Sequence, residues 1–447
     1  MTLDTSKQNL LDDLILKAKK KGADAADAVF IHGDSLSVSW HGGKIETLER
    51  AEGMDLGLRV LIGKRQACCS TSDLNSSALD EIVERAVSMA RVAPEDPYCG
   101  LAEEKDLAKH LQNLDLTDSF EPKAEELVDQ AKIMESALLS VAGVTNSDST
   151  HVGSSKNHVY LAASNGFAGG YSRTSHWLSA SAVAGEGTSM VTDNDWHNKT
   201  HRVDLPTPEE VGRRAGEKTV KNLGARKMPT GKVPVVFDPD EAGSLLGCLA
   251  GAINGSEIAR GTSFLKNAMN QKIFGDKIRI IDDPSRPRGL RSRLFDAEGL
   301  SVERRAIVEN GVLQSWILDL RTARQLGLKS TGHAVRGSSS VPSPSVSNFY
   351  METGECSPQE LIKDIKNGFY VTQTMGMGIN DTTGDYSLSA RGFWIEDGKI
   401  TFPVHEMTIA SNLKEMFLNL TPANDLIFRY GIDAPTLRIE GMTVAGM

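Results

Sequence analysis

The chain has 447 residues, of which 40% are hydrophobic and 24% are charged, and its formal net charge is −10. These values are typical of a globular protein with two or three domains, because single cores stop growing at about 250–300 residues. The acidic balance argues against direct nucleic-acid binding, which would need a concentrated basic patch. No signal-peptide pattern and no membrane-length apolar stretch occurs, and the five cysteines form no disulfide framework, so a cytoplasmic location is expected.

The first half of the chain mixes helical and strand-like segments. Apolar residues at helical spacing predict four helices, over residues 5–22, 78–92, 123–141 and 207–224. Period-two patterns and turn residues predict strands over residues 24–32, 35–41 and 53–70, and several antiparallel strands with tight turns within residues 142–200. The proline-containing stretch 94–122 is expected to be a connector.

Pro229 and Gly231 interrupt the chain after the fourth helix and mark the clearest domain boundary. We therefore expect an N-terminal domain over residues 1–228, with a sub-boundary near 95–122. A C-terminal domain is expected over residues 229–447.

Short strands and turns dominate the second half. Two hairpins are predicted, in which Glu309-Asn310-Gly311 joins residues 304–308 to 313–318 and residues 396–399 join 392–395 to 400–404. Helices are expected at 239–254 and near 357–367. The predicted class is therefore α+β, with an N-terminal α/β domain of antiparallel strands and helices and a C-terminal β-rich domain that is sandwich-like or barrel-like.

The helix over residues 239–254 follows an apolar strand over 233–237. Asp238 is suited to the N-cap and Pro239 to the first helical position, while Glu241 completes a capping-box pattern. The apolar residues that recur at helical spacing are Leu245, Leu246, Leu249, Ala250 and Ile253. They predict one buried face.

Glycines fall at every fourth position of this helix: Gly243, Gly247, Gly251 and Gly255. Each interior glycine costs about 1 kcal/mol of helix stability relative to alanine, so this cost must be offset by a contact that the missing side chains allow. Close approach by another backbone is the expected gain. That backbone can come from the same domain, or the stripe can form an intersubunit or peptide-lining surface.

Several short motifs occur in an order and spacing that point to one family. They are Arg260-Gly261-Thr262-Ser263, Asp282-Asp283-Pro284, residues 295–299, 307–313, 347–350 and 395–400, and the close from Ala434-Pro435 to Gly446. With them, the chain resembles the TldD/PmbA family, also called the modulator of DNA gyrase family. The resemblance is densest after Val233 and looser in the first half.

In this family, one branch carries His-Glu-x-x-x-His on the helix as a zinc protease site, with a cysteine near the C-terminus as a further ligand. Here the three motif positions read Gly247, Cys248 and Ala252, and no cysteine follows Cys356. The region where the late ligand would fall, residues 424–435, contains none. Because zinc needs imidazole, thiolate or carboxylate ligands, the chain resembles the PmbA/TldE branch, which lacks the metal.

The resemblance implies a non-metal-binding subunit of a cytoplasmic TldD/TldE-type metalloprotease that acts on unfolded or extended peptides. Zinc is then expected in a TldD-like sister subunit, and neither catalytic nor metal-binding residues are expected in this chain. One alternative is a homodimeric peptide-binding or chaperone-like module without proteolysis. A second is a self-sufficient hydrolase that uses Cys248.

Other candidate sites are weaker. His197 and His201 have the i, i+4 spacing of a helical zinc pair, but they lie in a strand or loop context and are interpreted as surface histidines. Cys248 lies about two to three turns into the helix, beyond the strongest effect of the helix dipole, and the sequence shows no obligatory base nearby. It is therefore interpreted as a small buried residue. The paired acids Asp282 and Asp283 are interpreted as structural loop carboxylates.

Overall fold

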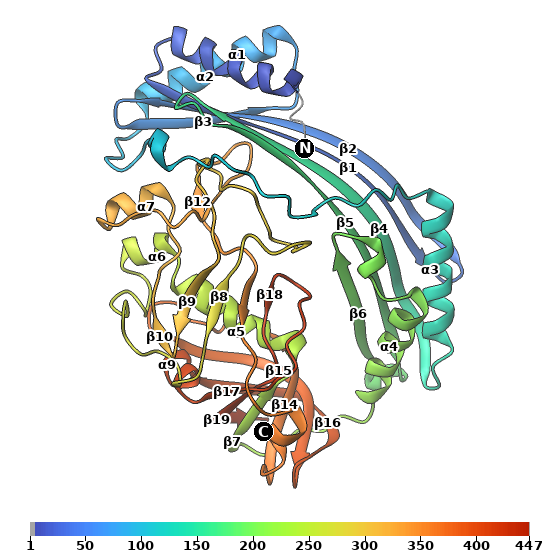
Figure 1. The fold of residues 1–447 in the computed structure, drawn as a ribbon. Coiled ribbons are helices and arrows are strands. Elements are labelled where there is room, and N and C mark those ends of the chain that lie inside the picture. Colours follow the sequence, from blue (N-terminus) through green and yellow to red (C-terminus); the bar gives the residue numbers. More distant parts are fainter. Residues whose placement is uncertain (1–4, 447) are drawn as a thin grey trace.

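The computed structural model describes residues 5–446, which form two parts of different construction (Figure 1). The first part is a six-stranded antiparallel sheet that arches over the second. Its strands, in spatial order, are β3 (Arg65–Thr71), β2 (Lys44–Ile62), β1 (Ala25–His41), β4 (Val144–Ala163), β5 (Ala168–Ala184) and β6 (Val191–Lys199). The predicted antiparallel strands within residues 142–200 are therefore confirmed.

Two strand boundaries differ from the predictions. The strands predicted over 24–32 and 35–41 are one strand, β1, which begins at Ala25, because Gly33 continues the pairing with both Gly53 and Asn157. The predicted strand over 53–70 is two strands, since Gly63 takes a positive φ of 57° and turns the chain between β2 and β3.

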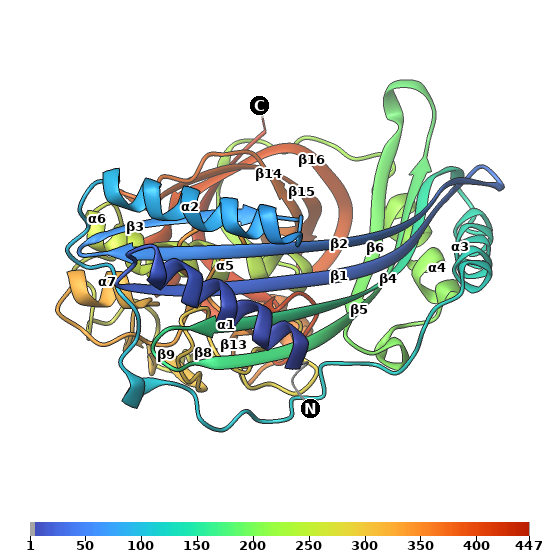
Figure 2. The same ribbon diagram turned by 90° about the horizontal axis from the view of Figure 1, so that it is seen from above.

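Helices cover both ends of the convex face of the sheet (Figure 2). They are α1 (Thr5–Lys20) and α2 (Ser76–Val92) at one end, and α3 (Ala124–Leu139) and α4 (Pro208–Lys221) at the other. All four predicted helices are confirmed. Each helix buries one stripe of residues at helical spacing and exposes the opposite stripe to solvent. In α1 the buried residues are Leu11, Leu14, Ile15 and Ala18.

The concave face of the sheet packs on the C-terminal part of the chain. Val29 and Leu161 of the sheet share an apolar cluster with Phe295 and Leu300. Beside it, Asp27 on β1 forms buried ion pairs with both Arg59 of β2 and Arg336. These contacts join the two parts into one body.

The C-terminal part is centred on a sheet that closes on itself. Its order is β16 (Lys399–Asn412), β15 (Asp385–Glu396), β14 (Asn367–Met375), β7 (Gly231–Phe237), β19 (Leu437–Ala445) and β17 (Leu420–Pro422), and β16 also pairs with β19. A second sheet has the order β10 (Val312–Leu313), β9 (Arg305–Glu309), β8 (Ile280–Asp282), β13 (Phe349–Met351) and β18 (Ile432–Asp433). The predicted α+β class with a β-rich, barrel-like C-terminal domain is confirmed.

Both predicted hairpins are present, but the second strand of the first hairpin, predicted over residues 313–318, is only the two-residue β10. The β9–β10 hairpin turns through Asn310 and Gly311, and the β15–β16 hairpin turns through Asp397 and Gly398, with all four residues at positive φ. Asparagine, aspartate and glycine are the residues that tolerate this conformation, which is why the turn signal was readable.

Short elements complete the C-terminal part. They are the pair β11 (Ala334–Val335) and β12 (Ser343–Pro344) and the helices α5 (Pro239–Ala252), α6 (Gly255–Arg260), α7 (Leu320–Gln325), α8 (Pro358–Ile362) and α9 (Leu413–Leu418). The helix predicted near 357–367 is only the five-residue α8, because residues from Asn367 onward pair as strand β14. Among residues 5–446, no helix combines the length and apolar character needed to cross a membrane.

Candidate functional site

Helix α5 directly follows strand β7, and its first turn is held by Asp238. The Asp238 carboxylate accepts a hydrogen bond from the Asp240 backbone N at 3.0 Å and another from the Tyr370 hydroxyl at 2.7 Å. The predicted capping box is wrong, because Glu241 turns toward strand β14 instead. Its carboxylate accepts hydrogen bonds from the backbone N and the hydroxyl of Thr374, at 3.1 and 2.6 Å. Polar contacts to β14 therefore anchor the start of α5.

The three degenerate motif positions have different surroundings on α5. A side chain at Gly247 would meet no heavy atom within 4 Å, whereas Ala252 is fully buried. Cys248 is half-buried and packs against the main core of the C-terminal part. Burial raises the pKa of the Cys248 thiol to about 11, and Asp381 nearby adds to the shift. Because the thiolate is the reactive form, this environment disfavours a nucleophilic role.

The four glycines do not form one continuous stripe. Helix α5 ends at Ala252, and Gly255 opens the separate helix α6 after a break capped by Asn254. A Cβ at Gly243 would lie 2.7 Å from the Ile432 carbonyl oxygen, and a Cβ at Gly255 would lie 2.8 Å from that of Ile317. These two glycines therefore allow close packing within the chain.

The other two glycines, Gly247 and Gly251, face open space. A Cβ at either position would have no neighbouring heavy atom within 4 Å. The exposed part of α5 is thus a bare helix surface, and a ligand or partner backbone could approach it closely.

The segment 424–435 lies beside the start of α5. Arg429 forms an ion pair with Asp240, the Tyr430 hydroxyl approaches the same carboxylate at 3.4 Å, and Ile432 packs at Gly243. Here, residues far apart in the sequence form one surface with the motif helix.

An ion cluster, which we call the α4–α5 cluster, connects the arched sheet to α5. Lys218 of α4 lies between Asp195 of β6 and Asp240 of α5, at 3.0 and 3.2 Å. Asp195 also pairs with Arg214 at 2.8 Å and with His197 at 3.0 Å. Although burial opposes ionisation, His197 and Lys218 hold the pKa of Asp195 well below its usual range. The cluster fixes the position of the motif helix relative to the arch.

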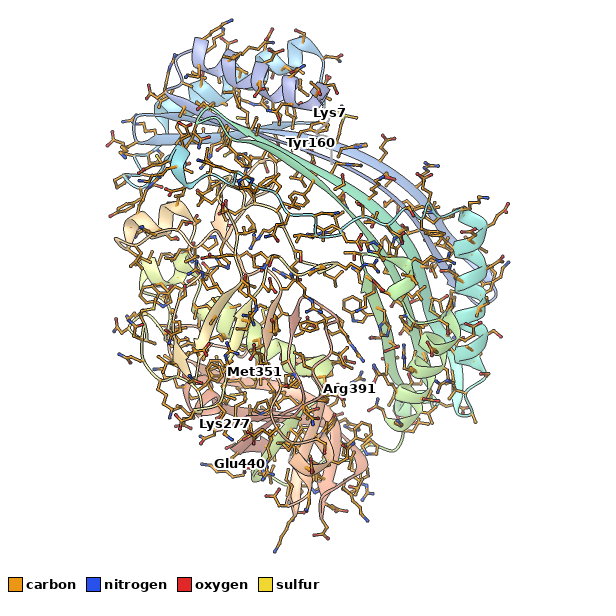
Figure 3. All side chains as sticks on the ribbon, viewed as in Figure 1. Lys7, Tyr160, Lys277, Met351, Arg391 and Glu440 are labelled. Carbon is orange, nitrogen blue, oxygen red and sulfur yellow. The ribbon has the colours of Figure 1, made fainter. Side chains whose placement is uncertain are left out.

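A second bridge between the two parts comes from strand β15. The Arg391 guanidinium donates to the Thr192 carbonyl at 2.7 Å and lies 3.5 Å from the Asp193 carboxylate, both on β6 (Figure 3). The edge of the arch is therefore tied to the closed sheet beside the α4–α5 cluster.

The interpretation of His197 and His201 as surface histidines is wrong. His197 is about 10% exposed and binds Asp195, while the buried His201 lies 3.3 Å from Asp115. Among the residues that the structure describes, the two histidines have no common partner, because His201 lies beyond the end of β6 and the chain has left the strand face that would align them. Their spacing therefore does not produce a shared site.

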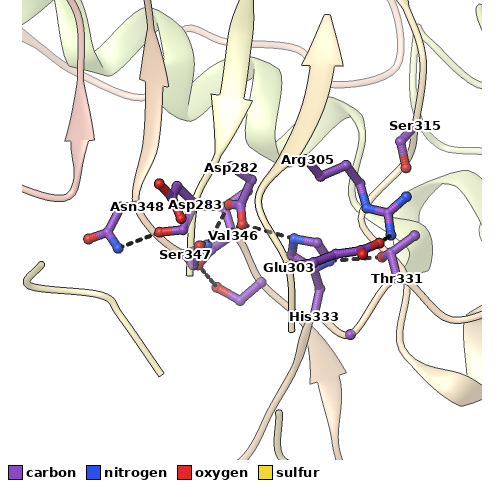
Figure 4. Close-up of polar contacts among 12 residues, drawn as sticks. Asp282, Asp283, Glu303, Arg305, Ser315, Thr331, His333, Val346, Ser347 and Asn348 are labelled. Carbon is purple, nitrogen blue, oxygen red and sulfur yellow. Dashed lines mark hydrogen bonds and ion pairs between the residues drawn. The ribbon is translucent and has the colours of Figure 1, made fainter. Parts of the chain in front are cut away.

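A buried acid–base pair lies at the end of strand β8, where the loop before β11 meets it (Figure 4). Asp282 ends strand β8 and accepts hydrogen bonds from the backbone N and hydroxyl of Ser347, at 2.6 and 2.5 Å. The His333 Nε2 lies 3.0 Å from the same carboxylate, and its Nδ1 lies 2.9 Å from the Thr331 hydroxyl. Burial opposes ionisation, but His333 and Ser347 lower the pKa of Asp282. Because Asp282 and His333 are at most 2% exposed, the pair holds loops together rather than meeting a substrate.

Family models match nearly the whole chain. The PmbA/TldA metallopeptidase C-terminal domain matches residues 230–446, the central domain matches 117–223, and domain 1 matches 26–90. Metalloprotease PmbA of Escherichia coli O157:H7 is 34% identical over 95% of this chain and 93% of its own length. The chain belongs to the PmbA/TldD family.

Relatives of known structure have the same architecture. A proposed modulator of DNA gyrase from Bacteroides thetaiotaomicron has a TM-score of 0.92 and 28% identity, with both chains covered completely. TldE from Thermococcus kodakarensis, at 20% identity, has a TM-score of 0.87 over 98% of this chain and all of its own. A PmbA homolog from Haemophilus influenzae is 33% identical over 96% of this chain and 94% of its own length.

The motif residues of this PmbA/TldD chain do not fit a zinc ion. Gly247 and Ala252 carry no donor atom, and the Cys248 thiol lies in an environment that keeps it protonated. Among residues 5–446, no group of three or more His, Cys, Asp or Glu side chains is arranged to hold a metal ion.

Sequence reasoning missed the residues that attach α5 to the rest of this PmbA/TldD chain. Asp195, Lys218, Asp240 and Arg429 are each separated by at least 20 residues and carry no local motif. The adjacent acidic start of the helix was readable, but the identity of its cationic partners was not.

Proposed function

We propose that this chain is the metal-free subunit of a two-chain peptidase of the PmbA/TldD type. A TldD-like sister chain would hold zinc, polarise the peptide carbonyl and activate water. The observation that carries the proposal is the chemistry of α5, where Gly247, Cys248 and Ala252 occupy the motif positions. The names of the relatives, metalloprotease PmbA in Escherichia coli and metalloprotease TldD homolog in Buchnera, support a peptidase context.

We propose unfolded or extended peptides as substrates. The bare surface of α5 supports this choice, because an extended chain can lie against a helix surface without side chains more closely than a folded domain can. The bare α5 positions Gly247 and Gly251 would line the peptide path or the contact with the sister chain, since both have open space above them.

The role of Cys248 in a self-sufficient hydrolase is disfavoured by its raised pKa and its core contacts. Within the described part of the chain, no general base is paired with the thiol, as a nucleophilic cysteine would require. The alternative of a peptide-binding homodimer differs from the main proposal in the partner, which would be a second copy of this chain.

The five free thiols of the chain support the cytoplasm as its compartment.

Mixing experiments test the proposal. The chain is purified alone, the His-Glu-x-x-x-His relative from the same genome is purified alone, and the two are combined. We expect cleavage of an unstructured peptide and stoichiometric zinc in the combined particle. Cleavage by this chain alone would contradict the proposal, and failure of the two chains to associate would favour the homodimer.

A variant of the bare helix surface provides a second test. Gly247→Leu adds a side chain where the chain leaves open space, so the fold should persist. We expect it to weaken association or peptide cleavage in the combined particle. Leu16→Ala, on an exposed position of α1, serves as a surface control that should leave both unchanged.

A further inference from the structure

A small basic pocket opens where the end of strand β6 meets the C-terminal part. Its volume is about 250 Å³, and its charged lining residues are Lys199, Asp204, Arg286, Arg288, Arg429 and Asp433. Four cations and two carboxylates leave an excess of two positive charges in a chain whose net charge is −10. Two carboxylates outside the lining, Asp115 and Asp240, neutralise Arg288 and Arg429, so an anionic ligand would be bound by the cations that have no ion-pair partner.

Most of the charged groups in this pocket already have partners. Arg288 pairs with Asp115 at 2.7 Å and with Asp204 at 3.1 Å, while Arg429 is bound to Asp240. The Asp433 carboxylate accepts three hydrogen bonds from the backbone N atoms of residues 429–431, at 2.8–3.0 Å. These groups therefore shape the wall and have little left to offer a ligand.

Two cations in the pocket still have N–H donors available to a ligand. The Lys199 ammonium makes one hydrogen bond, to the Phe428 carbonyl at 2.8 Å, and keeps two donors. Within residues 5–446, no hydrogen bond or ion pair involves the Arg286 guanidinium, which lies over the Phe428 ring at 3.3 Å from its centroid. Stacking fixes the orientation of the planar guanidinium while leaving its N–H edges free, and this suits two-point binding of a carboxylate.

The pocket shares a wall with the motif helix. Arg429 lines the pocket and also binds Asp240 in the first turn of α5, while Ile432 of the same segment packs against Gly243. A volume of 250 Å³ corresponds to roughly eight waters at about 30 Å³ each. That space holds a carboxylate with part of one residue and excludes a folded partner.

We propose that this pocket binds the C-terminal carboxylate of a peptide, held between Arg286 and Lys199. The inference rests on the proposed function, because it names how a peptide on the α5 surface is anchored. The chain then recognises the free C-terminus of a peptide, so peptides with an available C-terminus are preferred to internal loops. Burial lowers the pKa of Lys199, in accord with a cation that lacks a full counter-charge.

Peptide binding to the isolated chain tests the pocket directly. The probe is an N-terminally dansylated ten-residue peptide of Gly, Ser, Thr and Ala, prepared with a free C-terminal carboxylate and as the C-terminal amide. A third peptide is amidated and carries one internal Glu. A charged hydrogen-bond pair is typically worth about tenfold or more in affinity, so the acid peptide should bind about tenfold more tightly than either amide.

Matched variants assign the effect to residues. Arg286→Met and Lys199→Met should each weaken the acid peptide about tenfold and leave the amide unchanged. Arg85→Met removes the same charge from an exposed guanidinium on α2, outside the pocket, and should change affinity by less than about twofold. Arg286→Lys keeps the charge without the planar fork and should retain intermediate affinity, which separates a binding defect from misfolding.

The outcomes are distinct. Equal affinity for acid and amide peptides overturns the pocket assignment and leaves the proposed function standing. Equal affinity of the acid and internal-Glu peptides shows that acidic side chains, rather than chain ends, are read, which also overturns the assignment. If none of the three peptides binds, the peptide-binding role itself fails.

Discussion

Replacing Gly243 and Gly247 by alanine separates the two kinds of glycine on helix α5. Alanine is more favourable than glycine by about 0.8–1.0 kcal/mol within a helix, so Gly247→Ala should stabilise the chain by about that amount. At Gly243 the new Cβ would lie 2.7 Å from the Ile432 carbonyl oxygen, which cannot retreat as a flexible side chain would. Overpacking of this kind costs about 1–3 kcal/mol, so Gly243→Ala should be destabilising by about 1 kcal/mol after the helical gain.

The two variants should thus differ by about 2 kcal/mol, although each adds one methyl group to one helix. For a domain of the size of the C-terminal part, this corresponds to a difference in melting temperature of about 4–8 °C. Thermal unfolding is followed by tryptophan fluorescence, because Trp316 and Trp394 lie in or against the core around α5. Gly251→Ala is the matched second control and should resemble Gly247→Ala. If Gly243→Ala were as stable as these two, the packing of segment 424–435 on α5 would be refuted.

Three further predictions concern reactivity, pH and loop packing. Cys248 should be alkylated about tenfold more slowly than an ordinary thiol. A pKa of about 11 lowers the thiolate fraction about 100-fold, and the higher nucleophilicity of that thiolate recovers about tenfold in rate. Peptide mapping measures the alkylation rate, and fast labelling would contradict the environment described. Asp195→Asn should destabilise by about 2 kcal/mol at neutral pH. Because the folded pKa of Asp195 lies below the unfolded value, its contribution is complete above about pH 5 and is lost as pH falls through the folded pKa. The urea midpoints of variant and parent should therefore begin to converge below about pH 4 and meet only as the pH approaches the folded pKa. Ser347→Ala should cost about 1.5–3 kcal/mol by removing the hydroxyl bound to Asp282, and an unchanged midpoint would contradict that hydrogen bond.

Local signals in the chain predicted the helices and turns well. The apolar spacing in α1 and α2 and the turn residues Asn310-Gly311 and Asp397-Gly398 act over a few residues, so they were readable without the fold. Strand lengths were less readable. Gly33 looks like a break, yet it continues strand β1 because pairing on both sides with Gly53 and Asn157 outweighs its weak strand propensity.

The candidate site shows the same division. That Gly247 and Ala252 carry no zinc ligand follows from residue identity, and it holds in any fold. That Gly243 packs on Ile432 while Gly247 faces open space depends on where segment 424–435 returns to α5.

The sequence by itself determined the class of the chain, its main helices and hairpins, and the absence of donor atoms at the two histidine positions of the motif, because these properties reside in single residues or short periodic patterns. Only the tertiary structure decided that Lys218 joins Asp195 to Asp240, and that Arg286 and Lys199 share one pocket. The sequence around a charged side chain does not indicate which residue that side chain pairs with. Their pairing is set by the burial and docking of elements that lie far apart along the chain.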